Sequence, residues 1–204
     1  MERMYMAPPR KRLRRALVRA AFGCCVIVLA AAGFALRPAS AQSGPSSLAL
    51  EQRVKVAFLY KFLGYTEFPV NAFADAASPI VIGVVGADDM AAELARTVAG
   101  RSINNRPVAV RALRESELGT SLHLLFVAGS DCAKGARLVK AATGALLVVT
   151  ECESGAPRGS VINFRIVDER VRFDVALDVA ERNNVKLSSR LLTVANHVQK
   201  GAQP

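Results

Sequence analysis

The first regular pattern of apolar and polar residues lies between Leu48 and about Phe62. Apolar side chains recur there at spacings of three or four residues, at Leu50, Val54, Ala57, Phe58 and Phe62, while Arg53, Lys55 and Lys61 lie off that line. This spacing is typical of an amphipathic helix. Pro69 follows shortly afterwards, and we expect the helix to have ended before it.

Short apolar runs then alternate with helical stretches. The runs cover residues 80–85, 108–111, 122–127 and 145–150 and are bounded by glycine, proline or polar residues, as is typical of strands in a parallel sheet. We expect helices from about Met90 to Val98, around Glu115–Leu118, and from Ser130-Asp131 to about Ala142. Aspartate precedes the first and third of these helices, where its side chain can act as the N-cap.

The pattern changes after Gly155. Residues 160–166 and 170–176 predict two strands joined by Val167-Asp168-Glu169 as an antiparallel hairpin, and a last helical stretch runs from about Leu187 to Val198. The sequence therefore predicts a single three-layer α/β domain over residues 48–200. Its sheet is mixed and mostly parallel, and it ends in the hairpin and a C-terminal helix.

The first 41 residues have the layout of a signal peptide. Basic residues cluster between Arg10 and Arg19, no charged residue occurs from Ala20 to Leu36, and Ala39-Ser40-Ala41 follows. We predict cleavage after Ala41 and export to the periplasm, with residues 42–47 as a flexible lead-in. The uncharged run is short for a membrane span, so a permanent anchor is not favoured. The basic leader leaves both Sec and Tat export open.

Removing the leader changes the interpretation of the charge. Residues 1–41 carry +7 of the formal net charge of +10, so about +3 remains on the rest of the chain. No basic stripe interleaved with aromatic residues remains either. The sequence therefore predicts no nucleic-acid partner.

The candidate chemical groups do not form a catalytic set. His123 and His197 are the only histidines, and neither has a partner at metal-ligand spacing, so no metal is predicted. The turn Gly83–Gly86 lacks the third glycine of a nucleotide-binding loop, and Glu151 and Glu153 are expected at the surface. We predict neither an enzyme nor a cofactor.

Cys132 and Cys152 are the two cysteines that follow the leader. Each lies just beyond a predicted strand, 122–128 and 145–150, and consecutive parallel strands often lie side by side. Both thiols would then lie at one edge of the sheet within bridging distance, which predicts a disulfide. Closing a loop of about 20 residues would stabilise the fold by about 3 kcal/mol. Its role as a structural bridge or a redox sensor is left open.

A series of segments resembles, in order and spacing, the YfiR-like family of periplasmic proteins from about residue 51 to residue 198. They comprise residues 54–62 with 66–69, residues 79–86, residues 106–108 with 124–127, residues 159–164, residues 171–175 and residues 187–192. The resemblance implies a non-catalytic regulator that inhibits a membrane-bound diguanylate cyclase through the periplasmic sensor region of that enzyme. It also implies a homodimer, sequestration by an outer-membrane lipoprotein, and an effect on cyclic di-GMP signalling and biofilm behaviour.

Two sets of residues are candidates for binding. On the hairpin, Phe164, Arg165 and Arg172 are the expected partner contacts, although Phe164 can instead be a core residue of its strand. The alternative function is a periplasmic small-ligand-binding protein. Its ligand would lie in the crevice beyond the carboxyl ends of the strands, near Gly86, Ser130 and Glu151.

Overall fold

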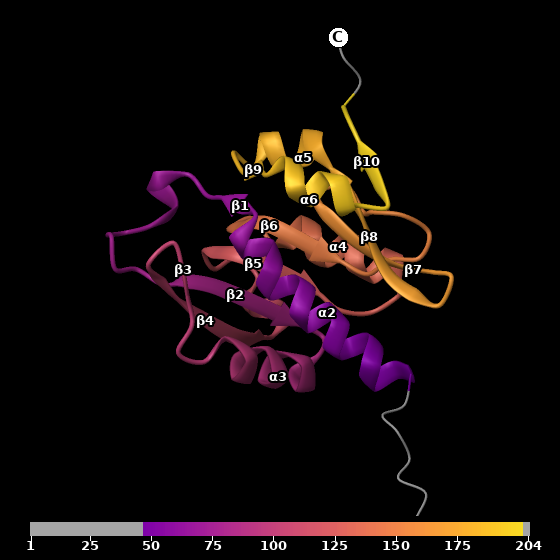
Figure 1. Ribbon diagram of the computed structural model, residues 1–204, viewed down its shortest axis with the longest axis horizontal. Coiled ribbons are helices and arrows are strands. Elements are labelled where there is room, and N and C mark those ends of the chain that lie inside the picture. The colour runs from indigo at the N-terminus through magenta and orange to yellow at the C-terminus, as the bar shows by residue number, and fades with distance from the viewer. Residues whose placement is uncertain (1–46, 202–204) are drawn as a thin grey trace, which may run out of the picture. The chain divides into compact units, whose positions relative to one another are not determined.

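A mixed sheet of eight strands forms the centre of the fold (Figure 1). The computed structural model describes residues 47–201. The strands, in spatial order, are β10 (His197–Gln199), β8 (Arg170–Ala176), β7 (Ile162–Val167), β6 (Ala145–Thr150), β5 (Leu122–Val127), β2 (Ile80–Val85), β4 (Arg106–Leu113) and β3 (Ser102–Ile103). All neighbours are parallel except the pairs β7–β8 and β3–β4. This is the mostly parallel α/β sheet with an antiparallel hairpin that the sequence predicts.

Helices cover both faces of this sheet. They are α2 (Ser47–Gly64), α3 (Asp88–Val98), α4 (Cys132–Ala141), α5 (Leu177–Arg182) and α6 (Ser189–Val194), with short 3-10 turns η1 (Val70–Ala72) and η2 (Glu115–Glu117). One buried core unites α2, α3, α5 and α6 with one sheet face, and a second core lies between α4 and the opposite face. A two-stranded ribbon joins β1 (Thr66–Glu67) to β9 (Lys186–Leu187). The three layers are therefore helices, sheet and helix.

The central strands match their predicted bounds because their side chains are buried on both faces. In β5, all six residues are buried, and from Leu124 onward successive residues enter opposite cores: Leu124 packs on the α2 side and Leu125 on the α4 side. Such strands produce continuous apolar runs that can be recognised in the sequence.

The helix caps follow the prediction at α4 but not at α3. Asp131 accepts hydrogen bonds from the backbone N–H groups of Ala133 and Lys134 and so caps α4 as expected. At α3 the N-cap is Ala87, and Asp88 and Asp89 lie inside the first turn. Carboxylates there still interact favourably with the helix dipole, so the same residues stabilise this end in a different way.

The predicted C-terminal helix is wrong in its extent. It was expected to continue to about Val198, but α6 ends at Val194 and the backbone becomes extended at Ala195. The backbone N–H of Asn196 then donates to the carbonyl of Phe173, and His197 begins β10, which runs parallel to β8. The short helix α5 was not predicted either. Pairing with β8 therefore overrides the local helical pattern.

The predicted bounds of the N-terminal regions can be compared only in part. The predicted signal peptide 1–41 and residues 42–46 of the lead-in lie outside the described residues. Ser47, which was assigned to the lead-in, is the first residue of α2. The residues of α2 that are buried in the core are Val56, Leu59, Phe62 and Leu63, so the predicted apolar line shares with the core Phe62 and, partly buried against it, Phe58.

Candidate functional site

The loops after β2 and β5 lie against each other at the carboxyl end of the sheet. Gly86 has a φ of +85°, and a Cβ added there would lie 3.1 Å from the carbonyl oxygen of Ala128, so this turn requires glycine. Gly86 and Glu151 line a hollow of about 650 Å³ beside α2, and Ser130 and Glu151 line an adjoining hollow of about 190 Å³. The structure thus brings the three predicted ligand residues to one region.

A lysine that sequence reasoning did not select occupies this crevice. The Lys55 ammonium lies 2.5 Å from a carboxylate oxygen of Glu51 and 2.6 Å from one of Glu151, and its side chain is only 12 % exposed. The backbone N–H of Gly129 donates to the other oxygen of Glu151. The one sequence signal for this arrangement is the i,i+4 spacing of Glu51 and Lys55.

The electrostatics keep Lys55 charged. Burial lowers its pKa, but hydrogen bonds and attraction from Glu151 and Glu51 outweigh burial and raise the pKa above 10.5. The ion pair joins α2 to the residue after β6, and its two side chains line both hollows of the crevice. Within residues 47–201, no group of three histidine, cysteine or acidic side chains has an arrangement that could hold a metal ion.

A disulfide closes the same edge of the sheet. Cys132 at the start of α4 is bonded to Cys152, and their Cα atoms lie 5.1 Å apart. β5 and β6 are parallel neighbours, as the prediction of this bond assumed. Asn163, fully buried, adds a second link, because its side chain accepts from the backbone N–H of Cys152 and donates to the Cys152 carbonyl. Asn163 is not among the candidate residues that the sequence suggests.

The three predicted partner contacts on the hairpin differ in exposure. Phe164 is 1 % exposed and packs against the rings of Phe58, Phe62 and Phe126, so it is a core residue and cannot contact a partner. Arg165 pairs with Asp174 at 3.6 Å. Arg172 lies opposite Arg165 across the hairpin and is exposed. The interpretation of Phe164 as a surface residue is therefore wrong.

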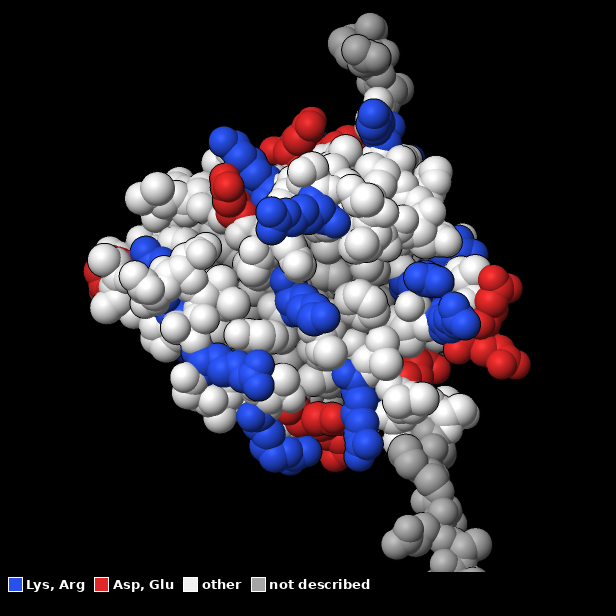
Figure 2. All heavy atoms as spheres, viewed as in Figure 1, with Lys and Arg blue, Asp and Glu red and all other residues white. Residues whose placement is uncertain are grey.

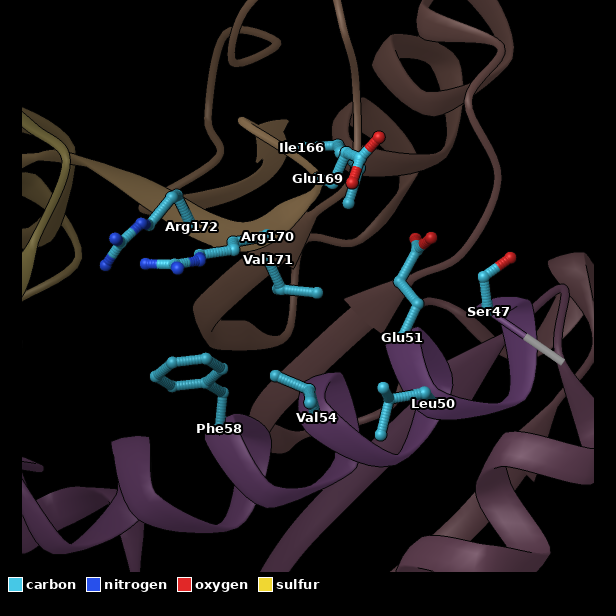
Figure 3. A pocket seen from close by; sticks show the side chains of 10 residues that line it. All are labelled: Ser47, Leu50, Glu51, Val54, Phe58, Ile166, Glu169, Arg170, Val171 and Arg172. Carbon is cyan, nitrogen blue, oxygen red and sulfur yellow. The ribbon is translucent and has the colours of Figure 1, made fainter. Parts of the chain in front are cut away.

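An apolar groove of about 770 Å³ lies between α2 and the hairpin (Figure 3). Its lining comprises Ser47, Leu50, Glu51, Val54, Phe58, Ile166, Glu169, Arg170, Val171 and Arg172. Leu50 is 56 % exposed and Ile166 is 46 % exposed. Figure 3 shows Leu50, Val54 and Phe58 projecting from α2 toward the hairpin, where the side chains of Arg170 and Arg172 run beside each other.

The face that contains this groove carries more basic than acidic charge at its centre. Figure 2 shows Lys and Arg side chains spread across the middle of the face, whereas Asp and Glu lie toward its margins. Arg170 and Arg172 have no carboxylate partner among the residues that the structure describes. The groove therefore combines exposed apolar side chains with two arginines that form no ion pair in the described part of the chain.

His123 has a structural environment rather than a catalytic one. Its ring stacks on Phe73 at a centroid distance of 4.4 Å, its Nδ1 accepts from the backbone N–H of Val81, and its Nε2 lies 3.2 Å from the carbonyl oxygen of Ala72. Burial lowers the pKa of His123, and the positive charge of Arg106 lowers it further. The neutral ring thus connects the segment around η1 to the sheet.

Comparison with known proteins assigns the chain to a family. A family model described as YfiR/HmsC-like matches residues 52–196, more than half of the chain. The chain belongs to the YfiR/HmsC-like family. This confirms the resemblance, and the YfiR/HmsC-like family is a class of periplasmic regulators. A search of curated proteins finds no match. None of the helices between residues 47 and 201 is long and apolar enough to cross a membrane.

Proposed function

We propose that this protein is an exported, non-catalytic regulator that inhibits a membrane-bound diguanylate cyclase by binding the periplasmic sensor region of that enzyme. Membership of the YfiR/HmsC-like family supports a regulatory role in the periplasm. The structural observation that carries a binding function is the apolar groove between α2 and the hairpin, where Leu50 and Ile166 remain exposed. Contiguous exposed apolar surface of this kind marks interaction sites.

The proposed mechanism is stoichiometric. A protein that binds one conformation of the sensor more tightly than the other shifts the equilibrium toward the bound conformation, by no more than that difference in affinity. We propose that the inactive sensor is the conformation that is bound. We also propose a homodimer and sequestration by an outer-membrane lipoprotein, as the family resemblance implies. Binding to the sensor, to a second copy or to the lipoprotein requires no titrating or nucleophilic group.

Cellular cyclic di-GMP tests this proposal. Deleting the gene should raise the cyclic di-GMP concentration, and restoring the full-length gene should lower it again. A version without residues 1–41 should not lower it, because the protein would remain in the cytoplasm, away from the sensor region. An unchanged cyclic di-GMP concentration in the deletion strain under several envelope stresses would contradict the proposal.

The alternative function is periplasmic binding of a small ligand near Gly86, Ser130 and Glu151. The hollow of about 650 Å³ favours it, since small-molecule sites have comparable volumes. The Lys55 ion pairs count against it, because they already satisfy Glu151. Mass spectrometry of denatured protein from the periplasm tests this alternative: a stoichiometric small molecule that disappears in a Gly86→Val variant would support it.

A further inference from the structure

The helix α2 carries two apolar stripes, and the second is covered only at one end, where Phe58 packs against Phe62 and Phe173. Val56, Leu59 and Phe62 are buried in the core. Leu50, Val54 and Phe58 form a second stripe at i, i+4 and i+8, which lines the groove (Figure 3). Rows of side chains at this spacing are the ridges that pack into the grooves of a neighbouring helix. The second stripe is therefore shaped to receive another helix.

The hairpin supplies the other wall of the groove. Ile166 and Val171 face each other across β7 and β8, and both line the groove beside Arg170 and Arg172. Of the two carboxylates in the lining, Glu51 is bound to Lys55 and Glu169 lies at the hairpin turn. Arg170 and Arg172, in contrast, form no ion pair within the described residues, so their guanidinium groups give this part of the wall a local positive charge. An occupant that is complementary to it carries carboxylates beside its apolar residues.

We infer that the groove binds an amphipathic acidic helix of a partner protein, which packs alongside α2. The lining extends along α2 from Ser47 to Phe58, about 16 Å of helix, so it accommodates about three turns. Apolar residues of the partner helix contact Leu50, Val54 and Ile166, and its carboxylates pair with Arg170 and Arg172. This inference rests on the proposed regulatory function and names the chemistry of the partner segment.

The probes are two stapled alanine-based peptides of about 15 residues, long enough to be held helical. Both carry leucines at i, i+4 and i+8, flanked by glutamates in one peptide and by lysines in the other. Fluorescence anisotropy with the purified protein should give tighter binding of the glutamate peptide. Equal binding of the two peptides, or no binding of the glutamate peptide at millimolar concentration, would overturn the inference.

Three variants test the geometry. Leu50→Asp should lower the affinity for the glutamate peptide by more than about tenfold. The matched control Val194→Asp alters an exposed valine on α6 outside the groove and should leave affinity unchanged. The double variant Arg170→Glu with Arg172→Glu should lower the affinity for the glutamate peptide by about fivefold and raise the affinity for the lysine peptide. The expected change is modest because exposed ion pairs contribute modestly to binding. An unreversed preference would overturn the charge argument, since loss of folding cannot produce a reversal.

Two further outcomes separate this inference from its alternatives. If a second copy of the chain covers the groove, the wild-type protein will sediment as a dimer and the Leu50→Asp variant as a monomer. That result would overturn the inference, because the occupant would then be a second copy and not a partner helix. In cells, Leu50→Asp at the native locus should raise cyclic di-GMP to the level of the deletion strain. If deletion raises it and Leu50→Asp does not, the groove inference fails while the proposed function stands.

Discussion

The ammonium of Lys55 lies 2.6 Å from a carboxylate oxygen of Glu151, although the two residues are 96 positions apart in the sequence. The contact connects the N-terminal helix α2 to the residue that follows β6. It is largely shielded from water, since the two side chains are 12 % and 18 % exposed. Removing one partner of a shielded ion pair costs more than removing one partner of an exposed pair, because the remaining charge is left buried without its counter-ion.

Replacing Lys55 with methionine should lower the free energy of unfolding by about 2 kcal/mol, because Glu51 and Glu151 would lose their shared cation. Since the pKa of Lys55 is raised above 10.5, its contribution is complete below pH 10.5 and is lost as the pH rises through the raised value. Urea denaturation measures the change. Lys61→Met, at an exposed position of the same helix, is the control, and equal stability of the two variants would contradict the prediction.

Loss of the disulfide should cost about 3 kcal/mol of stability, because the bond closes a loop between residues 20 positions apart. Urea denaturation of the double variant Cys132→Ser with Cys152→Ser measures this, with the reduced wild-type protein as a comparison. Alkylation of native periplasmic protein without reductant should label neither thiol. Full labelling of both would refute the bond in the exported protein.

Acidification should destabilise the protein through His123. Its folded pKa is lowered, mainly by burial, below the ordinary 6.5, so the unfolded chain binds the proton more readily. The stabilisation that neutral His123 provides is present above pH 6.5 and is lost as the pH falls through the lowered pKa of the folded state. Between pH 7.5 and pH 5, the melting temperature of the wild type should fall more steeply than that of His123→Gln, with both proteins measured in the same buffers. Parallel curves would rule out this role.

Phe164→Ala should destabilise the protein by about 4 kcal/mol, since it opens a cavity among Phe58, Phe62 and Phe126. Arg172→Ala, on the opposite strand of the hairpin and exposed, should change stability by less than about 0.5 kcal/mol. Calorimetry of the two variants separates the core residue from the surface residue. Similar melting temperatures would contradict the burial of Phe164.

Protein purified from the periplasm should begin at Gln42, because the sequence predicts cleavage after Ala41. Intact-mass analysis measures this directly. A mass that includes the leader would contradict the predicted cleavage, and fractionation would then locate the protein.

The bounds of an element could be predicted accurately where its local sequence pattern had only one structural explanation. The strands at 80–85, 122–127 and 145–150 match their predicted bounds because their residues are mostly apolar, and the polar ones, His123 and Thr150, are buried with hydrogen-bond partners. For α2, the line through Leu50, Val54 and Phe58 is real, but it lines the groove, and of these three residues Phe58 also packs against the core. Two apolar stripes on one helix cannot be told apart by periodicity alone.

The parts of the site that could not be predicted depend on contacts between distant residues. Lys55 on a helix surface is ordinarily solvated, and nothing local indicates Glu151 as its partner. Asn163 in a strand suggests only a polar position, yet its amide pairs with the backbone of Cys152. In contrast, Cys132 and Cys152 were predictable, because the order of parallel strands places their ends together.

The ribbon of β1 and β9 has a consequence for folding kinetics. Thr66 pairs with Leu187, more than a hundred residues further along the chain, so the segment after α2 acquires its partner strand only when nearly all of the domain has been made. Contacts of such high sequence separation raise the contact order and slow folding. The β1–β9 ribbon is therefore expected to form late in folding, after the strands of the main sheet have paired.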